Sequence, residues 1–161
     1  MLPDEILRDA ESLLAACRAR QVMLATAESC TGGLIAAALT AIAGSSDVVD
    51  RGFVTYSNDA KHEMLGVKMA LIETHGAVSE PVAGAMAEGA LARSRAAIAV
   101  AVTGVAGPAG GSAEKPVGLV WFGLARAGAP TQTERLVFPG DRSDIRAATV
   151  AHAFKMIGSA L

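Results

Sequence analysis

The chain has 161 residues, of which 52% are hydrophobic and 4% aromatic, and its formal net charge is −2. This length and apolar content suffice for one domain whose core is built from small side chains. The near-neutral charge and the lack of a basic run argue against a nucleic-acid partner. The apolar stretches are shorter than the roughly 20 residues of a membrane-spanning helix. The acidic N-terminus lacks the basic start of a secretory signal, so we expect a cytoplasmic protein without a membrane partner.

The first half of the chain alternates predicted helices and strands. Apolar residues recur every three or four positions between Asp4 and Arg20, which predicts an opening α-helix. The short apolar run Val22–Ala27 suits a buried strand, and a small-residue helix is predicted at Leu34–Ala43. Arg51–Tyr56 has the β-branched and aromatic content of a further strand.

Capping residues mark the remaining helices. Asn58 can cap a helix that runs through Leu65 and has Lys61 in its first turn. Ser79 is expected to cap a longer helix, and a closing helix begins at about Asp141. Three further strands are predicted at Ala97–Thr103, Gly118–Ala125 and Gln132–Phe138.

Helices that alternate with strands, followed by strands joined through Gly-containing turns, are typical of the α/β class. We therefore predict a three-layer α/β/α sandwich on a mixed, mostly parallel sheet of about five strands. No linker or internal repeat divides the chain, so residues 1–161 are expected to form a single domain. Exposed helix faces with small residues lead us to expect a homo-oligomer.

The first polar cluster follows the predicted strand that ends at Ala27. Its sequence is Glu28-Ser29-Cys30-Thr31-Gly32-Gly33. A serine between a strand and a Gly-rich helix start lies beside free backbone N–H groups and the positive end of the helix dipole, which can stabilise an anion. This is where an acyl-transfer nucleophile and its oxyanion hole would be found.

A serine nucleophile needs an adjacent base at neutral pH. The three histidines do not lie in Gly- or Ser-rich turns and lack metal-ligand spacing, so neither a Ser-His-Asp triad nor a metal site is supported. Lys61 can act instead if burial lowers its pKa. Tyr56 lies in the same segment and could hold or relay a proton.

Structural interpretations of these residues remain open. Ser29 could simply cap the following helix, and a lysine on a helix surface is commonly solvated. Tyr56 at a strand end could serve packing alone. Glu28 could pair with Lys61, cap the turn or orient the nucleophile.

A second Gly-rich cluster follows the strand predicted at Ala97–Thr103. Its glycines permit a nest of backbone N–H groups that can bind a phosphate. The spacing matches neither the Walker sequence nor G-x-G-x-x-G, so a structural turn and an anion site are both open. The residues concerned are Thr103, Gly104, Gly107, Gly110 and Gly111.

Six ordered motifs together resemble the CinA C-terminal domain family, which contains the nicotinamide-nucleotide amidohydrolases. They span nearly the whole chain: Ala27–Gly33, Gly52–Asn58 with Lys61, Gly76–Ser79, Thr103–Pro108 with Gly110-Gly111, Lys115–Gly118 and Gly140–Arg142. Many members carry this unit behind a larger N-terminal domain, so the chain resembles the stand-alone form.

The resemblance implies hydrolysis of the carboxamide of nicotinamide mononucleotide to nicotinate mononucleotide and ammonia, without a metal or organic cofactor. It also implies that Ser29 is the nucleophile and that Lys61 and Tyr56 activate it. The expected substrate-binding residues are Glu28, Cys30, Thr31, Gly32, Gly33, Asn58, Thr103, Gly104, Gly107, Gly110, Gly111 and Arg142, the last a candidate for the phosphate.

Three alternatives stand beside this hypothesis. In one, Cys30 is the nucleophile and Glu28 and Lys61 assist it. In the second, the domain is a non-catalytic nucleotide-binding or regulatory module. In the third, it is an interaction protein whose glycines serve only packing.

Overall fold

The structure, a computed structural model, describes residues 2–161 and contains one five-stranded sheet in the order β2-β1-β3-β4-β5. The strands are β1 (Leu24–Glu28), β2 (Val49–Val54), β3 (Ile98–Gly104), β4 (Leu119–Arg126) and β5 (Gln132–Val137). Strand β1 is parallel to both of its neighbours, whereas β4 is antiparallel to β3 and to β5. The predicted mixed sheet is confirmed. Only β4 runs against the other strands, although parallel and antiparallel pairings are equal in number.

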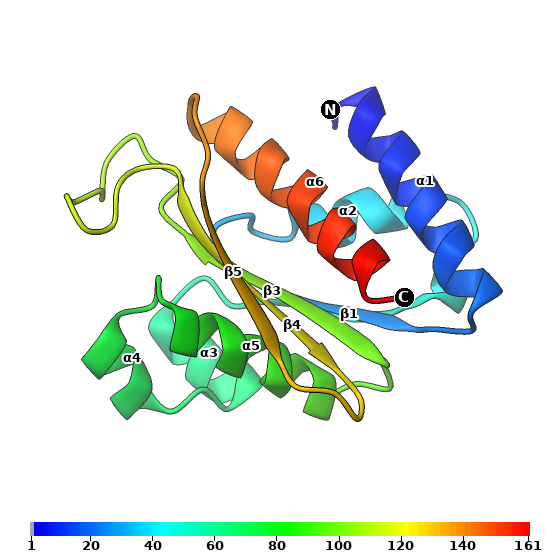
Figure 1. The fold of residues 1–161 in the computed structure, drawn as a ribbon, viewed down its shortest axis with the longest axis horizontal. Coiled ribbons are helices and arrows are strands. Elements are labelled where there is room, and N and C mark those ends of the chain that lie inside the picture. The colour runs from blue at the N-terminus through cyan, green and yellow to red at the C-terminus, as the bar shows by residue number, and fades with distance from the viewer. Residues whose placement is uncertain (1) are drawn as a thin grey trace.

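Helices cover both faces of the sheet. They are α1 (Asp4–Ala19), α2 (Leu34–Thr40), α3 (Asn58–Leu65), α4 (Met69–His75), α5 (Glu80–Ala92) and α6 (Arg142–Ser159), with a 3₁₀ turn η1 at Ser45–Asp47. Figure 1 shows α1, α2 and α6 on one face and α3, α4 and α5 on the other. The predicted α/β/α sandwich is therefore present.

The core on the α5 side of the sheet is built from small residues. Ala25, Ala27, Ala99 and Ala101 present short side chains from β1 and β3 to this layer. At Gly123 of β4 an added Cβ would overlap the Ala83 carbonyl oxygen of α5. The high alanine and glycine content thus allows the helix to approach the sheet closely.

Local capping differs from the expectation at two helices. The N-cap of α3 is Ser57, whose Oγ accepts from the Ala60 N–H at 3.0 Å, so the prediction that Asn58 caps this helix is wrong. Ser79 occupies the N-cap position of α5, but its hydroxyl donates to the Gly76 carbonyl at 2.7 Å instead of capping the helix. Helix α4 was not predicted, because its N-cap residue, Lys68, has no capping side chain.

The carboxyl ends of β1, β2 and β3 lie at the same edge of the sheet, because these three strands are parallel. The chain leaves β1 through α2 on one face and leaves β2 through α3, α4 and α5 on the other. In open α/β sheets, ligands bind at the carboxyl ends of strands where the connections diverge in this way. Within residues 2–161, no helix combines the length and the apolar character needed to cross a membrane.

Candidate active site

A polar cavity of about 300 Å³ lies at the carboxyl ends of β1 and β3 and extends to the start of α6. It brings together most of the residues that the sequence singled out. Those that line it are Ser29, Cys30, Tyr56, Asn58, Lys61, Thr103, Gly104, Gly107, Gly110 and Arg142. Another cavity, of about 370 Å³, lies between α1 and α6 and is lined by Ser12 and Lys155, but within residues 2–161 these two side chains form no hydrogen bond with each other.

Ser29 and Lys61 are in direct contact. The Lys61 Nζ lies 3.0 Å from the Ser29 Oγ, although 32 positions separate the two residues in the sequence. Ser29 immediately follows β1, and Lys61 lies in the first turn of α3, which follows β2. Since β1 and β2 are parallel neighbours, their following segments meet at the same sheet edge.

The Lys61 side chain is buried, with 1% of its surface exposed. Its Nζ also faces the carbonyl oxygens of Thr55 at 2.8 Å, Tyr56 at 3.4 Å and Ser57 at 3.5 Å. Burial lowers the pKa of Lys61 from 10.5 to about 8, because an ammonium group loses its hydration there. The neutral amine is therefore accessible near neutral pH.

The contacts of Lys61 are compatible with a neutral amine that accepts a proton from Ser29. A neutral amine has two N–H groups and one lone pair. One N–H can donate to Thr55 and the other can be shared between Tyr56 and Ser57, since carbonyl oxygens only accept. The lone pair is then left for the Ser29 hydroxyl.

Glu28 points away from the cavity and caps α2. Its carboxylate, in a residue that is 1% exposed, accepts from the Thr31 hydroxyl at 2.6 Å and from the N–H groups of Ile35 at 2.8 Å and Ala36 at 3.0 Å. Neither Glu28 nor Thr31, Gly32 or Gly33 lines the cavity. The start of α2 is thus occupied by a protein carboxylate, contrary to the expectation that it faces the substrate.

The phenol of Tyr56 lies on the exposed side of the cavity. The residue is 61% exposed, and its hydroxyl accepts from an Arg142 guanidinium N–H at 3.1 Å. A second N–H of Arg142 donates to the Gly107 carbonyl at 2.7 Å. Within residues 2–161 the Tyr56 hydroxyl has no hydrogen bond to Ser29 or Lys61, so the Lys61–Ser29 contact is the direct one.

The loop after β3 forms a further wall of the cavity. Gly107 and Gly110 line it, whereas Gly111 does not. Among residues 2–161, no carbonyl accepts from the backbone N–H groups of Ala106, Gly107, Ala109 and Gly110. These donors are available to an anionic group.

Cys30 also lines the cavity, but its thiol is buried. Burial raises the pKa of this thiol to about 12, with a smaller contribution from the nearby Glu28 charge. A thiol with so high a pKa stays protonated at neutral pH, and the protonated form is a poor nucleophile. This observation argues against Cys30 as the nucleophile.

Several apolar residues that line the cavity were not predicted as site residues. Ala77 and Val78 line the cavity, as do Val105, Ala106 and Ala109. The Ala77 carbonyl accepts from the Thr103 hydroxyl at 2.9 Å, which ties the segment before α5 to the end of β3. Ala77 and Val78 belong to the motif Gly76–Ser79, so a signal for this wall existed in the sequence.

None of the lining residues described in the range 2–161 is a histidine. His62 contacts the Val67 carbonyl at 2.8 Å, and His152 of α6 pairs with Glu134 of β5 at 2.6 Å. Within the described range 2–161, no three His, Cys, Asp or Glu side chains are grouped so that they could hold a metal ion.

Comparison with known proteins identifies the family of the chain. The model of the CinA C-terminal domain family matches residues 8–161. The nicotinamide-nucleotide amidohydrolase PncC of Escherichia coli is 49% identical over 157 residues, covering 98% of this chain and 95% of that protein. The protein of the same name from Enterobacter agglomerans is 57% identical over 132 residues, covering 82% of this chain and 80% of that one.

A solved structure shows the same fold. The competence/damage inducible protein CihA from Agrobacterium tumefaciens matches with a TM-score of 0.94 at 53% identity, covering 97% of this chain and 95% of that one. The resemblance inferred from the six motifs is confirmed, and the chain belongs to the CinA C-terminal domain family.

Proposed function

We propose that this chain is a nicotinamide-nucleotide amidohydrolase that converts nicotinamide mononucleotide to nicotinate mononucleotide and ammonia, with Ser29 as nucleophile and Lys61 as base. The observation that carries the proposal is the 3.0 Å contact between Lys61 Nζ and Ser29 Oγ inside a polar cavity. Relatives that align over nearly the whole chain bear the name of this activity.

The first half of the reaction forms an acyl enzyme. Neutral Lys61 takes the Ser29 proton as the serine oxygen bonds to the carboxamide carbon. The tetrahedral intermediate then breaks its C–N bond, and the lysine ammonium returns the proton to the departing ammonia. This leaves nicotinate mononucleotide esterified to Ser29.

Water completes the cycle by the reverse proton path. Lys61, neutral again, accepts a proton from the attacking water, and the ester C–O bond breaks as the proton passes back to Ser29. The direct Lys61–Ser29 contact favours this route over a relay through Tyr56, whose hydroxyl contacts Arg142.

The oxyanion needs hydrogen-bond donors close to Ser29. These donors were expected in the Gly-rich turn at Cys30–Gly33, but the Gly32 N–H already donates to the Ser29 carbonyl at 3.0 Å. We assign the role to the Cys30 N–H, because Cys30 lines the cavity and no carbonyl within residues 2–161 accepts from its N–H. Loss of one such donor costs about 10²- to 10³-fold in rate.

The 5′-phosphate of the substrate is assigned to the opposite wall. Arg142 supplies a cation there, and the free N–H groups around Gly107 and Gly110 supply further donors. Backbone amides at positive-φ glycines commonly bind phosphate, and φ is +74° at Gly107 and +88° at Gly110.

We further propose that the enzyme is cytoplasmic and homo-oligomeric, and that its partner is the small-molecule substrate. Light scattering on the purified chain tests the oligomer, and a mass equal to one chain would contradict it.

Ammonia release from purified protein tests the activity. We expect turnover of nicotinamide mononucleotide in preference to nicotinamide riboside and nicotinamide, unchanged by a chelator. Ser29→Ala is the matched control for contaminating amidase. Tight binding of the mononucleotide without ammonia release would support the non-catalytic module instead.

A further inference from the structure

The residue before the nucleophile has its carboxylate buried on the far side of the turn. Four donors surround Glu28: the Thr31 hydroxyl and Ile35 N–H on Oε1, and the Ala36 N–H on Oε2 with the Thr26 hydroxyl at 3.4 Å. Both oxygens are thus engaged, and the charge faces the positive end of α2.

The backbone of the same residue is joined to the base. The Glu28 carbonyl accepts from the Thr55 N–H at 2.9 Å, and the Thr55 carbonyl accepts from Lys61 Nζ at 2.8 Å. The Ser29 N–H donates to the Val102 carbonyl of β3 at 3.0 Å. The main chain therefore holds the start of the Ser29 turn between β2 and β3.

Beyond Ser29 the turn contains two glycines, Gly32 and Gly33, with φ values of +60° and +99°. Its main chain is held by the hydrogen bond from Gly32 N–H to the Ser29 carbonyl and by the Thr31 carbonyl, which accepts from Leu34 N–H at 3.2 Å and from the Arg146 guanidinium of α6 at 2.8 Å. Glu28 spans this turn, because its carboxylate binds the hydroxyl of Thr31 within it and the N–H groups of α2 beyond it.

We propose that Glu28 is a positioning residue, which fixes the β1–α2 turn on α2 and thereby holds the Ser29 hydroxyl against Lys61. The inference rests on the proposed serine chemistry and extends it to a residue that neither lines the cavity nor contacts the reacting atoms. Glu28→Gln keeps the shape but puts an amide donor against the N–H groups of α2. Glu28→Ala leaves those groups without an acceptor.

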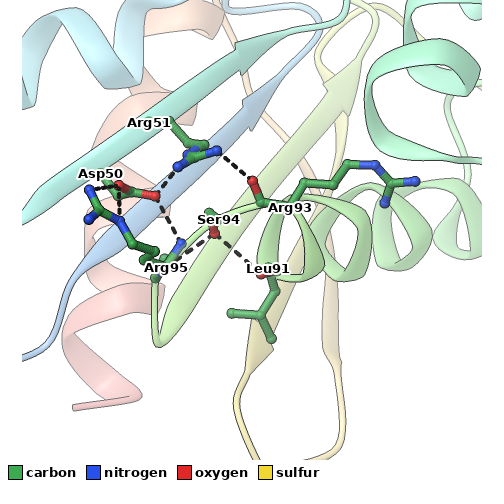
Figure 2. A network of polar contacts seen from close by, with 7 residues as sticks. Asp50, Arg51, Leu91, Arg93, Ser94 and Arg95 are labelled. Atoms are coloured by element: carbon green, nitrogen blue, oxygen red, sulfur yellow. Dashed lines mark hydrogen bonds and ion pairs between the residues drawn. The ribbon is translucent and has the colours of Figure 1, made fainter.

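The structure offers a matched control at the opposite end of the sheet. Asp50, near the start of β2, is a carboxylate with 2% of its side chain exposed, and it accepts from the Arg95 N–H at 2.9 Å and from Arg51 at 2.8 Å. Figure 2 shows this network, which joins β2 to the segment after α5. Five residues of extended strand, about 17 Å, separate Asp50 from Thr55, so Asp50→Asn makes the same chemical change far from Ser29.

The readout is the rate at which a fluorophosphonate probe labels Ser29. In this reaction the Ser29 Oγ–P bond forms as the P–F bond breaks, fluoride leaves, and Lys61 takes the serine proton. The rate thus reports the Ser29–Lys61 contact without any nucleotide. Each rate is divided by the folded fraction from circular dichroism, and kcat and KM for ammonia release are measured in parallel.

We expect labelling and kcat to fall about 10²-fold in Glu28→Ala, as displacement of a reacting group does. A smaller loss is expected in Glu28→Gln, and KM should change little. Asp50→Asn should stay within about twofold of the wild type, because distant sites act independently. Thr31→Val, which removes one donor to Glu28, is the mildest variant and should lose rate in the same direction.

Labelling and kcat at wild-type values in Glu28→Gln and Thr31→Val would overturn the inference, and so would an equal loss in Asp50→Asn. Wild-type protein that takes no label would also overturn it, because its premise is a reactive Ser29. Wild-type protein that is labelled but releases no ammonia would contradict the proposed function while leaving the role of Glu28 testable by labelling.

Discussion

The Lys61 Nζ contacts the Ser29 hydroxyl at 3.0 Å, and on its other sides this buried amine faces backbone carbonyl oxygens. Among residues 2–161 no carboxylate contacts the amine, so no ion pair from this part of the chain offsets its lost hydration. Burial thus creates the base, and the contact directs its lone pair to the serine.

Replacement of Ser29 should abolish activity, whereas replacement of its neighbour Cys30 should not. Ser29→Ala removes the nucleophile, and we expect ammonia release from nicotinamide mononucleotide to fall at least about 10³-fold. Cys30→Ala should retain activity within about threefold, because the thiol is protonated at neutral pH. Activity that survives the first change and is lost in the second would make Cys30 the nucleophile.

The rate should depend on pH through Lys61. With a pKa of about 8, the amine is neutral in about one molecule in ten at pH 7. We therefore expect kcat/KM to rise about tenfold per pH unit below pH 7 and to level off above about pH 9. A profile of kcat/KM between pH 5.5 and 9.5 measures this limb, and a flat profile would exclude Lys61 as the base.

The free energy of unfolding should depend on pH in the opposite direction to that given by a salt-bridged lysine, whose pKa is raised on folding. The folded-state pKa of Lys61, about 8, lies below the 10.5 of an exposed lysine, so the unfolded chain binds more protons between these values. The free energy of unfolding should therefore rise with pH from about 8 to 10.5, by about 3 kcal/mol in total relative to Lys61→Met. Urea titrations of both proteins at pH 7.5, 9 and 10.5 measure the difference, and a constant difference would contradict a depressed pKa.

Arg142 should affect binding of the phosphorylated substrate. Its guanidinium contacts Gly107 and Tyr56 at the cavity wall. Arg142→Ala should raise KM for nicotinamide mononucleotide about tenfold or more, the usual range for a charged hydrogen bond. The small turnover of nicotinamide riboside should not change. An equal effect on both substrates would mean that Arg142 acts on the loop and not on the phosphate.

Tyr56→Phe separates the direct route from the relay. Because the phenol contacts Arg142 and the base contacts Ser29, we expect kcat within about threefold of the wild type and a moderate rise in KM. Stopped-flow measurement of the acylation step gives the answer, and a loss as large as that of Lys61→Met would restore Tyr56 as the proton carrier.

Local features of the chain were predictable because they depend on near neighbours in the sequence. The strand ending near Ala27, the helix through Leu65 and the loop at Gly107 all follow from period, capping and glycine content. The errors were also local: Ser57 and Asn58 are both good capping residues, and the sequence does not decide between them. Helix α4 has seven residues and no capping side chain, so it has no comparable start signal.

The order of the five strands and the chemical groups that follow each of them could be predicted from the residues alone, because periodicity and turn residues act over a few positions. Which of these groups meet depends on the packing of the whole chain. In the folded chain Lys61 of α3 is a buried amine beside Ser29, and the Glu28 carboxylate binds the start of α2, where the substrate was expected. Desolvation and hydrogen-bond pairing depend on distances in space, which no spacing along the chain specifies.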